Sequence, residues 1–287
     1  MIRTAILIIL QLTAVCHAAD PVWTIARCVG APSHAVYDAE LQALYVSQIS
    51  GEGDARDGVG AISRIDLDGT MRECEWVSGL DAPKGIALYK KTLWVTDIDR
   101  LHRIDVEKGE VVECLEVPRA KFLTGIAVDS DGAIYLADML ASRVYHYRDG
   151  RFVVHSSGAD LESPAGLAID EGRLVVAPWG LTADYSTKVP GRLLFVERQK
   201  PRAVTAPLGN LYGLASDGAG GWLASDFTSG AVFHYSARTG IREVLKVSPG
   251  AAGIAYVPSK DLLIVPELTE NRISAYELKG IIPSESR

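Results

Sequence analysis

The sequence is short of cysteine, of basic charge and of long apolar stretches. Only 4 of its 287 residues are cysteine, and 29 Lys and Arg are outnumbered by 36 Asp and Glu, for a net charge of −7. The basic residues are scattered, so neither nucleic acid nor an anionic membrane surface is expected as a partner. No run of 18 apolar residues follows the amino-terminal segment, so membrane insertion is not expected either.

Motifs of several enzyme classes are also missing. The sequence has no Gly-x-Ser-x-Gly elbow, no His-Glu-x-x-His pair and no Gly-x-x-x-x-Gly-Lys loop. Their absence excludes common designs of serine hydrolases, zinc peptidases and P-loop enzymes. A composition of 48% hydrophobic and 23% charged residues is that of an ordinary globular protein.

The first 18 residues are typical of a secretory signal peptide. Arg3 gives a positive start, residues 5–12 are mostly apolar, and Cys16 and Ala18 are the small residues before a cleavage site at Ala19. The alternatives are an apolar first strand of the fold and a lipid anchor on Cys16, for which Val15 is too large. We expect a cleaved signal peptide over residues 1–18 and a periplasmic or secreted mature chain.

A five-residue motif recurs along the chain: a Pro, apolar or small residue, a variable residue, Gly, Ile or Leu, and Ala. Its glycines are Gly85, Gly125, Gly166, Gly213 and Gly253, and successive numbers differ by 40, 41, 47 and 40. Residues 32–36 form a degenerate first copy. Six copies with a period near 40 residues indicate repeated supersecondary units.

Each unit continues with short alternating strands joined by Asp and Gly turns, as in residues 134–136 and 143–147. No helical periodicity interrupts them, so each unit predicts a four-stranded antiparallel blade. The period excludes a β-sandwich and is too long for a β-helix. We expect an all-β, six-bladed β-propeller as a single domain over residues 19–280, followed by a short polar tail, 281–287.

The last unit ends near Leu278 with only three strands, whereas residues 22–27 form a strand without a blade. We expect this amino-terminal strand to complete blade six, because closure removes exposed strand edges. Cys28, Cys74 and Cys114 then fall on outer strands of different blades, farther apart than the about 4.4–6.8 Å between Cα atoms that a disulfide allows. Three free thiols are therefore predicted.

Two sets of residues should share one end of the central channel. The first set precedes the repeated glycines: His34, Lys84, Thr124, Ala165, Tyr212 and Ala252. The second set ends the second strands: Gln48, Asp97, Asp138, Pro178, Asp226 and Glu267. Long loops at residues 50–60 and 179–191 surround the same mouth, which predicts a pocket there.

The candidate ligand-binding residues are His34, Lys84, Asp97, Arg100, Asp138, Trp179, Tyr185 and Tyr212. Asp226 and Glu267 are the candidate catalytic carboxylates. Each Asp has a simpler interpretation, because an Asp at a strand end often accepts hydrogen bonds from turn amides. Four carboxylates at one mouth would otherwise need a cation, and a divalent ion such as calcium would suit them. No metal ligand or cofactor is assigned.

Residues 83–87, 123–138 and 164–176 resemble the repeats of the SMP-30/gluconolactonase/LRE-like proteins and of NHL-repeat propellers. Residues 45–47, 57–58, 80–85, 97–101 and 262–266 resemble an exported bacterial branch of that family. The resemblance implies a six-bladed propeller in which enzymatic members open sugar lactones with a divalent metal. Those members bind the metal with Glu, Asn and Asp, largely at the residue before each repeated Gly. The set containing Lys84, Ala165 and Ala252 departs from this pattern, so we expect the family metal site to be lost or rebuilt.

Three functions therefore compete. The first is an exported propeller that binds a small molecule or a protein partner at its mouth. The second is a metal-dependent hydrolase of the lactonase type that uses the mouth carboxylates. The third is acid–base chemistry by Glu267 alone, as in propellers that resemble strictosidine synthase.

Overall fold

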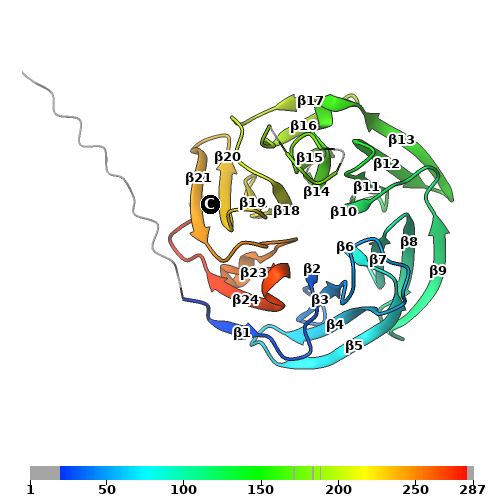
Figure 1. Ribbon diagram of the computed structural model, residues 1–287. Coiled ribbons are helices and arrows are strands. Elements are labelled where there is room, and N and C mark those ends of the chain that lie inside the picture. Colours follow the sequence, from blue (N-terminus) through cyan, green and yellow to red (C-terminus); the bar gives the residue numbers. More distant parts are fainter. Residues whose placement is uncertain (1–19, 171, 183, 188, 283–287) are drawn as a thin grey trace, which may run out of the picture.

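The computed structural model describes residues 20–170, 172–182, 184–187 and 189–282. It confirms the all-β, six-bladed propeller: six antiparallel four-stranded sheets surround a central channel (Figure 1). In five blades the strands run in chain order from the channel outward. In the described chain only three short 3₁₀ turns accompany the strands: η1 (Ala159–Leu161), η2 (Pro258–Lys260) and η3 (Leu268–Glu270).

Blades one to three contain β2 (Pro32–Asp38), β3 (Ala43–Gln48), β4 (Gly60–Asp66), β5 (Met71–Leu80), β6 (Pro83–Tyr89), β7 (Thr92–Asp97), β8 (Arg100–Asp105), β9 (Glu110–Glu116), β10 (Leu123–Val128), β11 (Ile134–Asp138), β12 (Arg143–Arg148) and β13 (Arg151–Ser157). Blades four to six contain β14 (Pro164–Asp170), β15 (Arg173–Pro178), β16 (Leu194–Glu197), β17 (Lys200–Ala203), β18 (Leu211–Ser216), β19 (Trp222–Asp226), β20 (Ala231–Ser236), β21 (Gly240–Lys246), β22 (Ala255–Val257), β23 (Leu262–Glu267) and β24 (Arg272–Glu277).

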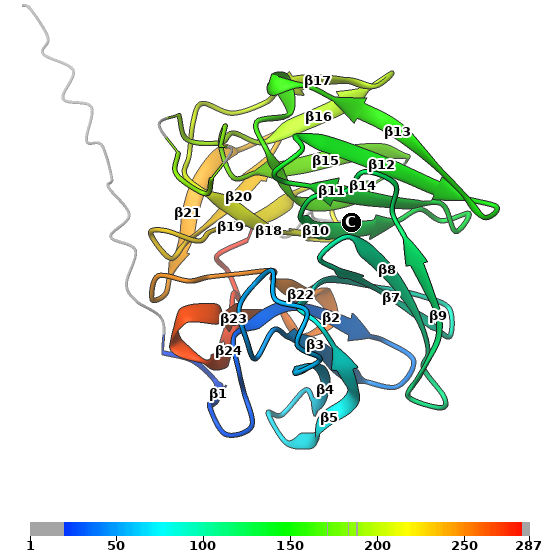
Figure 2. The same cartoon turned by 45° about the vertical axis from the view of Figure 1, so that its right-hand side comes forward.

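The amino-terminal strand β1 (Trp23–Ile25) closes the ring, as predicted. It pairs antiparallel with β24 through Trp23↔Ala275 and Ile25↔Ile273 and is the outer strand of blade six. Figure 2 shows this blue strand beside the orange-red strand β24. The Trp23 indole N–H also donates to the Leu67 carbonyl, at 2.8 Å, in the turn between β4 and β5. The first strand thus contacts both blades at the seam.

The prediction of three free thiols is wrong, because Cys28 and Cys74 form a disulfide with 5.5 Å between their Cα atoms. Cys28 does not lie on the outer strand of blade six. It follows β1 in the connection to blade one, where it reaches Cys74 on β5, the outer strand of that blade. Cys114 on β9 is a free, exposed cysteine. The disulfide therefore links the closing segment to blade one.

The repeated glycines lie where the innermost strands of neighbouring blades come closest. A Cβ added to Gly125 would lie 2.2 Å from the Ala165 carbonyl oxygen, and one added to Gly85 would lie 2.1 Å from the Thr124 carbonyl oxygen. Neither distance is compatible with a side chain. The hydrophobic clusters then form between blades, as where Leu44 and Val46 meet Ile264 of blade six.

Blade one departs from this glycine rule: residues 32–36 do align with the repeated motif, but the prediction that His34 belongs to the set before the glycines is wrong. His34 pairs with Ser47 after a bulge, so it occupies the glycine position, and Ser33 is the counterpart of Lys84. The His34 ring packs against Gly253, and the two residues form a parallel bridge between blades six and one. Because His34 takes the place of the glycine, the residue that precedes the glycine position in blade one is Ser33.

The predicted signal peptide, residues 1–18, lies outside the described residues, as does the end of the expected tail, 283–287. Ile281 and Ile282 pack against the cluster that contains Leu278 and Val265. In the described part of the chain, no helix has the length and apolar character needed to span a membrane.

Candidate functional site

One position at the mouth of the channel is apolar in all six blades. It directly follows the second strand of each blade, and its occupants are Ile49, Ile98, Met139, Trp179, Phe227 and Leu268. Because equivalent positions in a propeller point toward the same end of the channel, these side chains form an apolar ring. Of this ring, only Trp179 is among the residues predicted from the sequence, although an alignment of the repeats would reveal the whole pattern.

Five of these six residues line a cavity of about 460 Å³ at the mouth. Phe122, Tyr185 and Tyr212 supply further aromatic surface. Residues 51–53 of the 50–60 loop (Gly51, Glu52 and Gly53) form another part of the wall. Trp179, Tyr185 and Tyr212 are therefore brought together, as expected. The volume lies within the range of about 300–1,000 Å³ that is usual for small-molecule sites.

The aromatic side chains form two walls. Trp179, Tyr212 and Phe227 contact one another with ring centroids 5.4–6.3 Å apart. Phe122 and Tyr185 form an edge-to-face pair at 5.3 Å. Aliphatic Ala31, Ile49 and Leu268 belong to blades one and six and line the remaining side. Such a lining suits an apolar molecule with a flat body.

The predicted carboxylates do not line this cavity. Asp97 accepts hydrogen bonds from the amides of Asp81 (2.9 Å) and Ala82 (2.6 Å), just before the inner strand of its own blade. Asp138 accepts from the amides of Lys121, Phe122 and Ala141 at 2.9–3.1 Å. Asp226 accepts from the Asn210 amide, at 2.9 Å, and from the Ser229 hydroxyl. Each carboxylate is buried and accepts hydrogen bonds from the amides of a turn, which is the structural role often found for an Asp at a strand end.

Burial and hydrogen bonding have opposite effects on the pKa values of two of these carboxylates, Asp97 and Asp138. Burial raises the pKa of Asp97, but hydrogen bonds from His102 and the Ala82 amide outweigh it and hold the pKa below its usual range. For Asp138, burial outweighs the bonds from the Lys121 and Phe122 amides, so its pKa is raised. The main chain donates to both carboxylates, which therefore support the blades rather than a ligand.

Glu267 and Arg100 are also engaged away from the cavity. Buried Glu267 forms a two-pronged ion pair with Arg272, at 2.9 and 2.6 Å, and accepts from the Ser274 hydroxyl at 2.8 Å. Arg100 lies 3.4 Å from Asp81. An acid–base role for Glu267 would require this pairing to be broken.

Lys84 lies behind the cavity wall and is buried. Its ammonium donates to the carbonyl oxygens of Gly53 (2.6 Å) and Ala82 (2.9 Å) and sits 4.3 Å from the centroid of the Phe122 ring. Burial lowers the pKa of Lys84 to about 8, although Asp97 and Asp54 oppose that shift. Lys84 is thus a buried charged group behind the wall, whereas Glu52 belongs to the cavity lining itself.

A row of polar side chains lies beneath Tyr212. The Tyr212 hydroxyl and the Ser33 hydroxyl are 3.3 Å apart, and Ser33 Oγ is 3.1 Å from His34 Nδ1. Burial, together with nearby Lys84, lowers the pKa of His34 to about 3, so its ring is neutral at pH 7. Burial likewise raises the pKa of Tyr212 to about 12. His34 Nε2 meets no hydrogen-bond partner in the described structure.

The residues present do not fit the divalent metal that the family resemblance implies. The ring of side chains before the glycine positions offers Ser33, Lys84 and Thr124 with three apolar or aromatic residues. The neighbouring carboxylates already accept hydrogen bonds from the main chain or pair with Arg272. Within the described ranges, no three His, Cys, Asp or Glu side chains gather closely enough to hold a metal ion.

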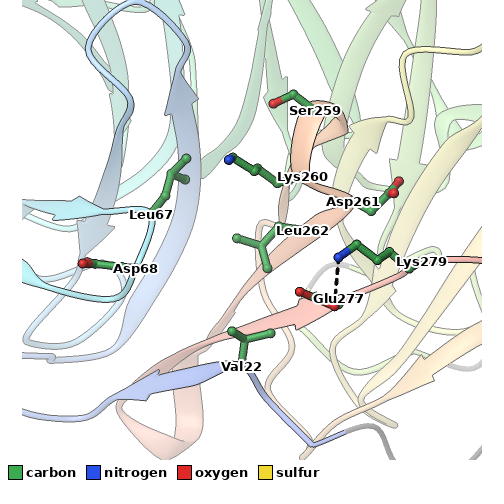
Figure 3. A pocket seen from close by; sticks show the side chains of 9 residues that line it. All are labelled: Val22, Leu67, Asp68, Ser259, Lys260, Asp261, Leu262, Glu277 and Lys279. Carbon is green, nitrogen blue, oxygen red and sulfur yellow. Dashed lines mark ion pairs between the residues drawn. The ribbon is translucent and has the colours of Figure 1, made fainter.

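A second cavity, of about 410 Å³, lies at the seam of the ring on the opposite face (Figure 3). It is lined by Val22 before β1, by Leu67 and Asp68 of the β4–β5 turn, and by residues around η2. Its charges are mixed, and Lys279 pairs with Glu277 at 3.5 Å. This cavity lacks the aromatic surface of the mouth.

The fold and the mouth together define a six-bladed β-propeller with an aromatic cavity at one end of its channel. Solved structures share the propeller fold. Catalytically inactive virginiamycin B lyase from Staphylococcus aureus, solved with quinupristin, matches with a TM-score of 0.61 and 13% identity over 88% of this chain and 97% of that one. A streptogramin B lyase matches with a TM-score of 0.62 and 12% identity over 88% of this chain and 96% of that one. Hydrazine synthase from Kuenenia stuttgartiensis matches with a TM-score of 0.62 and 12% identity over 88% of this chain and 97% of that one.

No family model matches the chain. No curated protein matches it either. At these identities the structural matches establish the fold alone, because one fold carries many functions.

Proposed function

We propose that this protein is an exported β-propeller that binds a small apolar molecule with a flat or aromatic body in its mouth cavity. The observation that carries the proposal is the cavity itself: about 460 Å³, with five aromatic residues and Met139 in its lining. Concave, mainly apolar pockets of this size bind small molecules by excluding water from both surfaces. A concave site of this size favours a small molecule over a protein partner.

Export is supported by two features. The amino-terminal segment has the pattern of a signal peptide, and Cys28 and Cys74 form a disulfide. Disulfides are stable in oxidising compartments such as the periplasm and the extracellular space. The related fold solved with quinupristin supports only the general point that a propeller can present a ligand site.

Fluorescence of the neutral dye N-phenyl-1-naphthylamine tests the binding proposal, since its emission rises in apolar surroundings. We expect saturable binding of one dye per chain, unchanged by EDTA. Leu268→Trp should weaken it at least about tenfold by filling the cavity, a loss of about 1.4 kcal/mol. Leu41→Trp is the matched control, because Leu41 is exposed in the turn between β2 and β3 on the opposite face. Equal binding by both variants, or no saturation, would overturn the proposal.

A further inference from the structure

The position of Lys84 relative to the cavity suggests more than a structural role. Two of its three ammonium hydrogens are donated to main-chain carbonyls, and the group lies over the Phe122 ring. Both Gly53 and Phe122 belong to the cavity wall. The Lys84 nitrogen therefore lies directly behind this part of the wall, in contact with the Gly53 carbonyl and the Phe122 ring.

A lysine with a purely structural role at this position would destabilise the fold. Burying an ammonium group without a direct carboxylate partner costs several kcal/mol, and its hydrogen bonds to carbonyls recover only part of that cost. The contact to Gly53 does fix the 50–60 loop, which Leu or Met could not do. Holding a loop needs only a donor, however, and an arginine or a glutamine would also provide one.

We propose that Lys84 is a reactive amine that captures an aldehyde or ketone bound in the mouth cavity as a reversible imine. The inference rests on the proposed function and names the class of ligand: a carbonyl group on an apolar, flat body. The aromatic walls would hold the body, and displacement of the Gly53 carbonyl would expose the amine.

The step balances without any further reagent. The uncharged Lys84 nitrogen attacks the carbonyl carbon, the C=O bond is replaced by C=N, and the oxygen leaves as water with the two hydrogens of the amine. A desolvated lysine in an apolar pocket is activated for this reaction because burial favours the uncharged form. With the pKa of Lys84 near 8, about a tenth of the amine is uncharged at pH 7.

Reductive trapping with cinnamaldehyde tests the inference. The protein is incubated at pH 7 with cinnamaldehyde and sodium cyanoborohydride, and labelled lysines are mapped by peptide mass spectrometry. We expect Lys84 to be labelled at least tenfold faster than Lys91, an exposed lysine paired with Glu107. Cinnamyl alcohol has the same body without a carbonyl, so it should bind in the cavity and protect Lys84 from labelling.

Variants sharpen the assignment. Lys84→Arg keeps a cationic donor for the Gly53 and Ala82 carbonyls but removes the amine, so it should abolish the fast labelling at this position. Lys91→Arg is the matched control and should leave the labelling of Lys84 unchanged. If Lys84→Arg does not fold, the comparison of Lys84 with Lys91 in the unmodified chain decides.

The outcomes separate the two proposals. If cinnamaldehyde and cinnamyl alcohol both displace the dye but Lys84 reacts no faster than Lys91, the amine inference fails and the binding function stands. Labelling of Lys84 that cinnamyl alcohol does not prevent also overturns the inference, because the aldehyde would then not react from the cavity. If neither compound displaces the dye and no fast labelling occurs, the inference fails, and the dye titration alone then decides the binding function.

Discussion

At the scale of single residues, the mouth combines an apolar surface with two buried titratable groups, Lys84 and His34. Burial disfavours the charged form of each group, so the pKa of each is lower in the folded protein than in water. Each should therefore leave a signature in the pH dependence of stability. The two signatures fall in different windows and can be measured separately.

Lys84 should make the fold more stable as the pH rises from 8 to 10.5. The folded chain releases this proton near pH 8, whereas the unfolded chain keeps it until about 10.5, so in this window the unfolded state binds more protons. From pH 7.5 to 10, urea unfolding should show the original chain gaining about 2 kcal/mol relative to Lys84→Met. Lys91→Met, at an exposed site, should show no such difference. If the free energy of unfolding of all three proteins changed with pH in the same way, the lowered pKa of Lys84 would be contradicted.

His34 should destabilise the fold in acid. Its folded pKa is about 3 and its unfolded value 6.5, so the stability is complete above pH 6.5 and is lost as the pH falls toward 3. At pH 4 the loss should reach about 3 kcal/mol. His34→Gln should show a correspondingly shallower decline in chemical-denaturation experiments between pH 7 and 4. The exposed pair Arg148–Asp131 offers a control in Arg148→Gln, which should leave the slope over this range nearly unchanged.

At the scale of elements, the repeat predicted most of the architecture. Five glycines at a near-constant spacing marked the inner strands, and the three-stranded last unit correctly placed the amino-terminal strand in blade six. The prediction worked because close packing at the channel leaves no room for a Cβ, which makes glycine visible in the sequence. In blade one only the assignment of His34 to the set before the glycines was off by one residue, because His34 itself takes the place of that glycine.

The glycine layer can be tested with a single methyl group. Gly125→Ala would place its Cβ 2.2 Å from the Ala165 carbonyl oxygen, so the inner strands of blades three and four would have to separate. We expect a loss of about 3 kcal/mol, at the upper end of overpacking effects. In Gly53→Ala the nearest atom, in the Phe122 ring, is 3.8 Å away, and the loss should stay below about 1 kcal/mol. Similar unfolding midpoints for the two variants would argue against close packing as the reason for the repeat.

The candidate site was harder to predict than the blades. Asp97, Asp138 and Asp226 are conspicuous as charges, yet the turns use all three as hydrogen-bond acceptors. The apolar ring, by contrast, consists of residues that look like ordinary core when each is considered alone. Chemical type shows which side chains can act, but only the geometry of six converging turns shows which of them face the cavity.

At the scale of the whole molecule, ring closure depends on one short strand and one disulfide. β1 has only three residues paired with β24, and Cys28 follows directly in the connection to blade one. The prediction that Cys28 and Cys74 lie too far apart for a disulfide was wrong, because Cys28 lies in the connection from β1 to blade one and not on the outer strand of blade six. Loss of β1 would expose the edge of β24, and opening of the ring would expose the apolar cluster that blades one and six share.

Removing the disulfide should therefore destabilise the whole ring. The bond joins residues 46 apart, and the chain-entropy relation for a loop of that length gives a stabilisation of about 4 kcal/mol. The double variant Cys28→Ser with Cys74→Ser should unfold at lower urea by a corresponding amount, whereas Cys114→Ser should match the original chain. Dithiothreitol should lower the midpoint of the original chain but not that of the double variant. An unchanged midpoint in the double variant would show that strand pairing alone closes the ring.

The same bond also determines how the molecule responds to mechanical force. A pull on the chain before Trp23 would first detach β1 from β24, one pair of residues after another, since the strand is loaded from its end. The detachment would stop at Cys28, where the load passes through the sulfur atoms into β5 and spreads over the four strands of blade one. Only the few residues of β1 would therefore separate from the ring, while the other strands of the six sheets stayed in place around the channel.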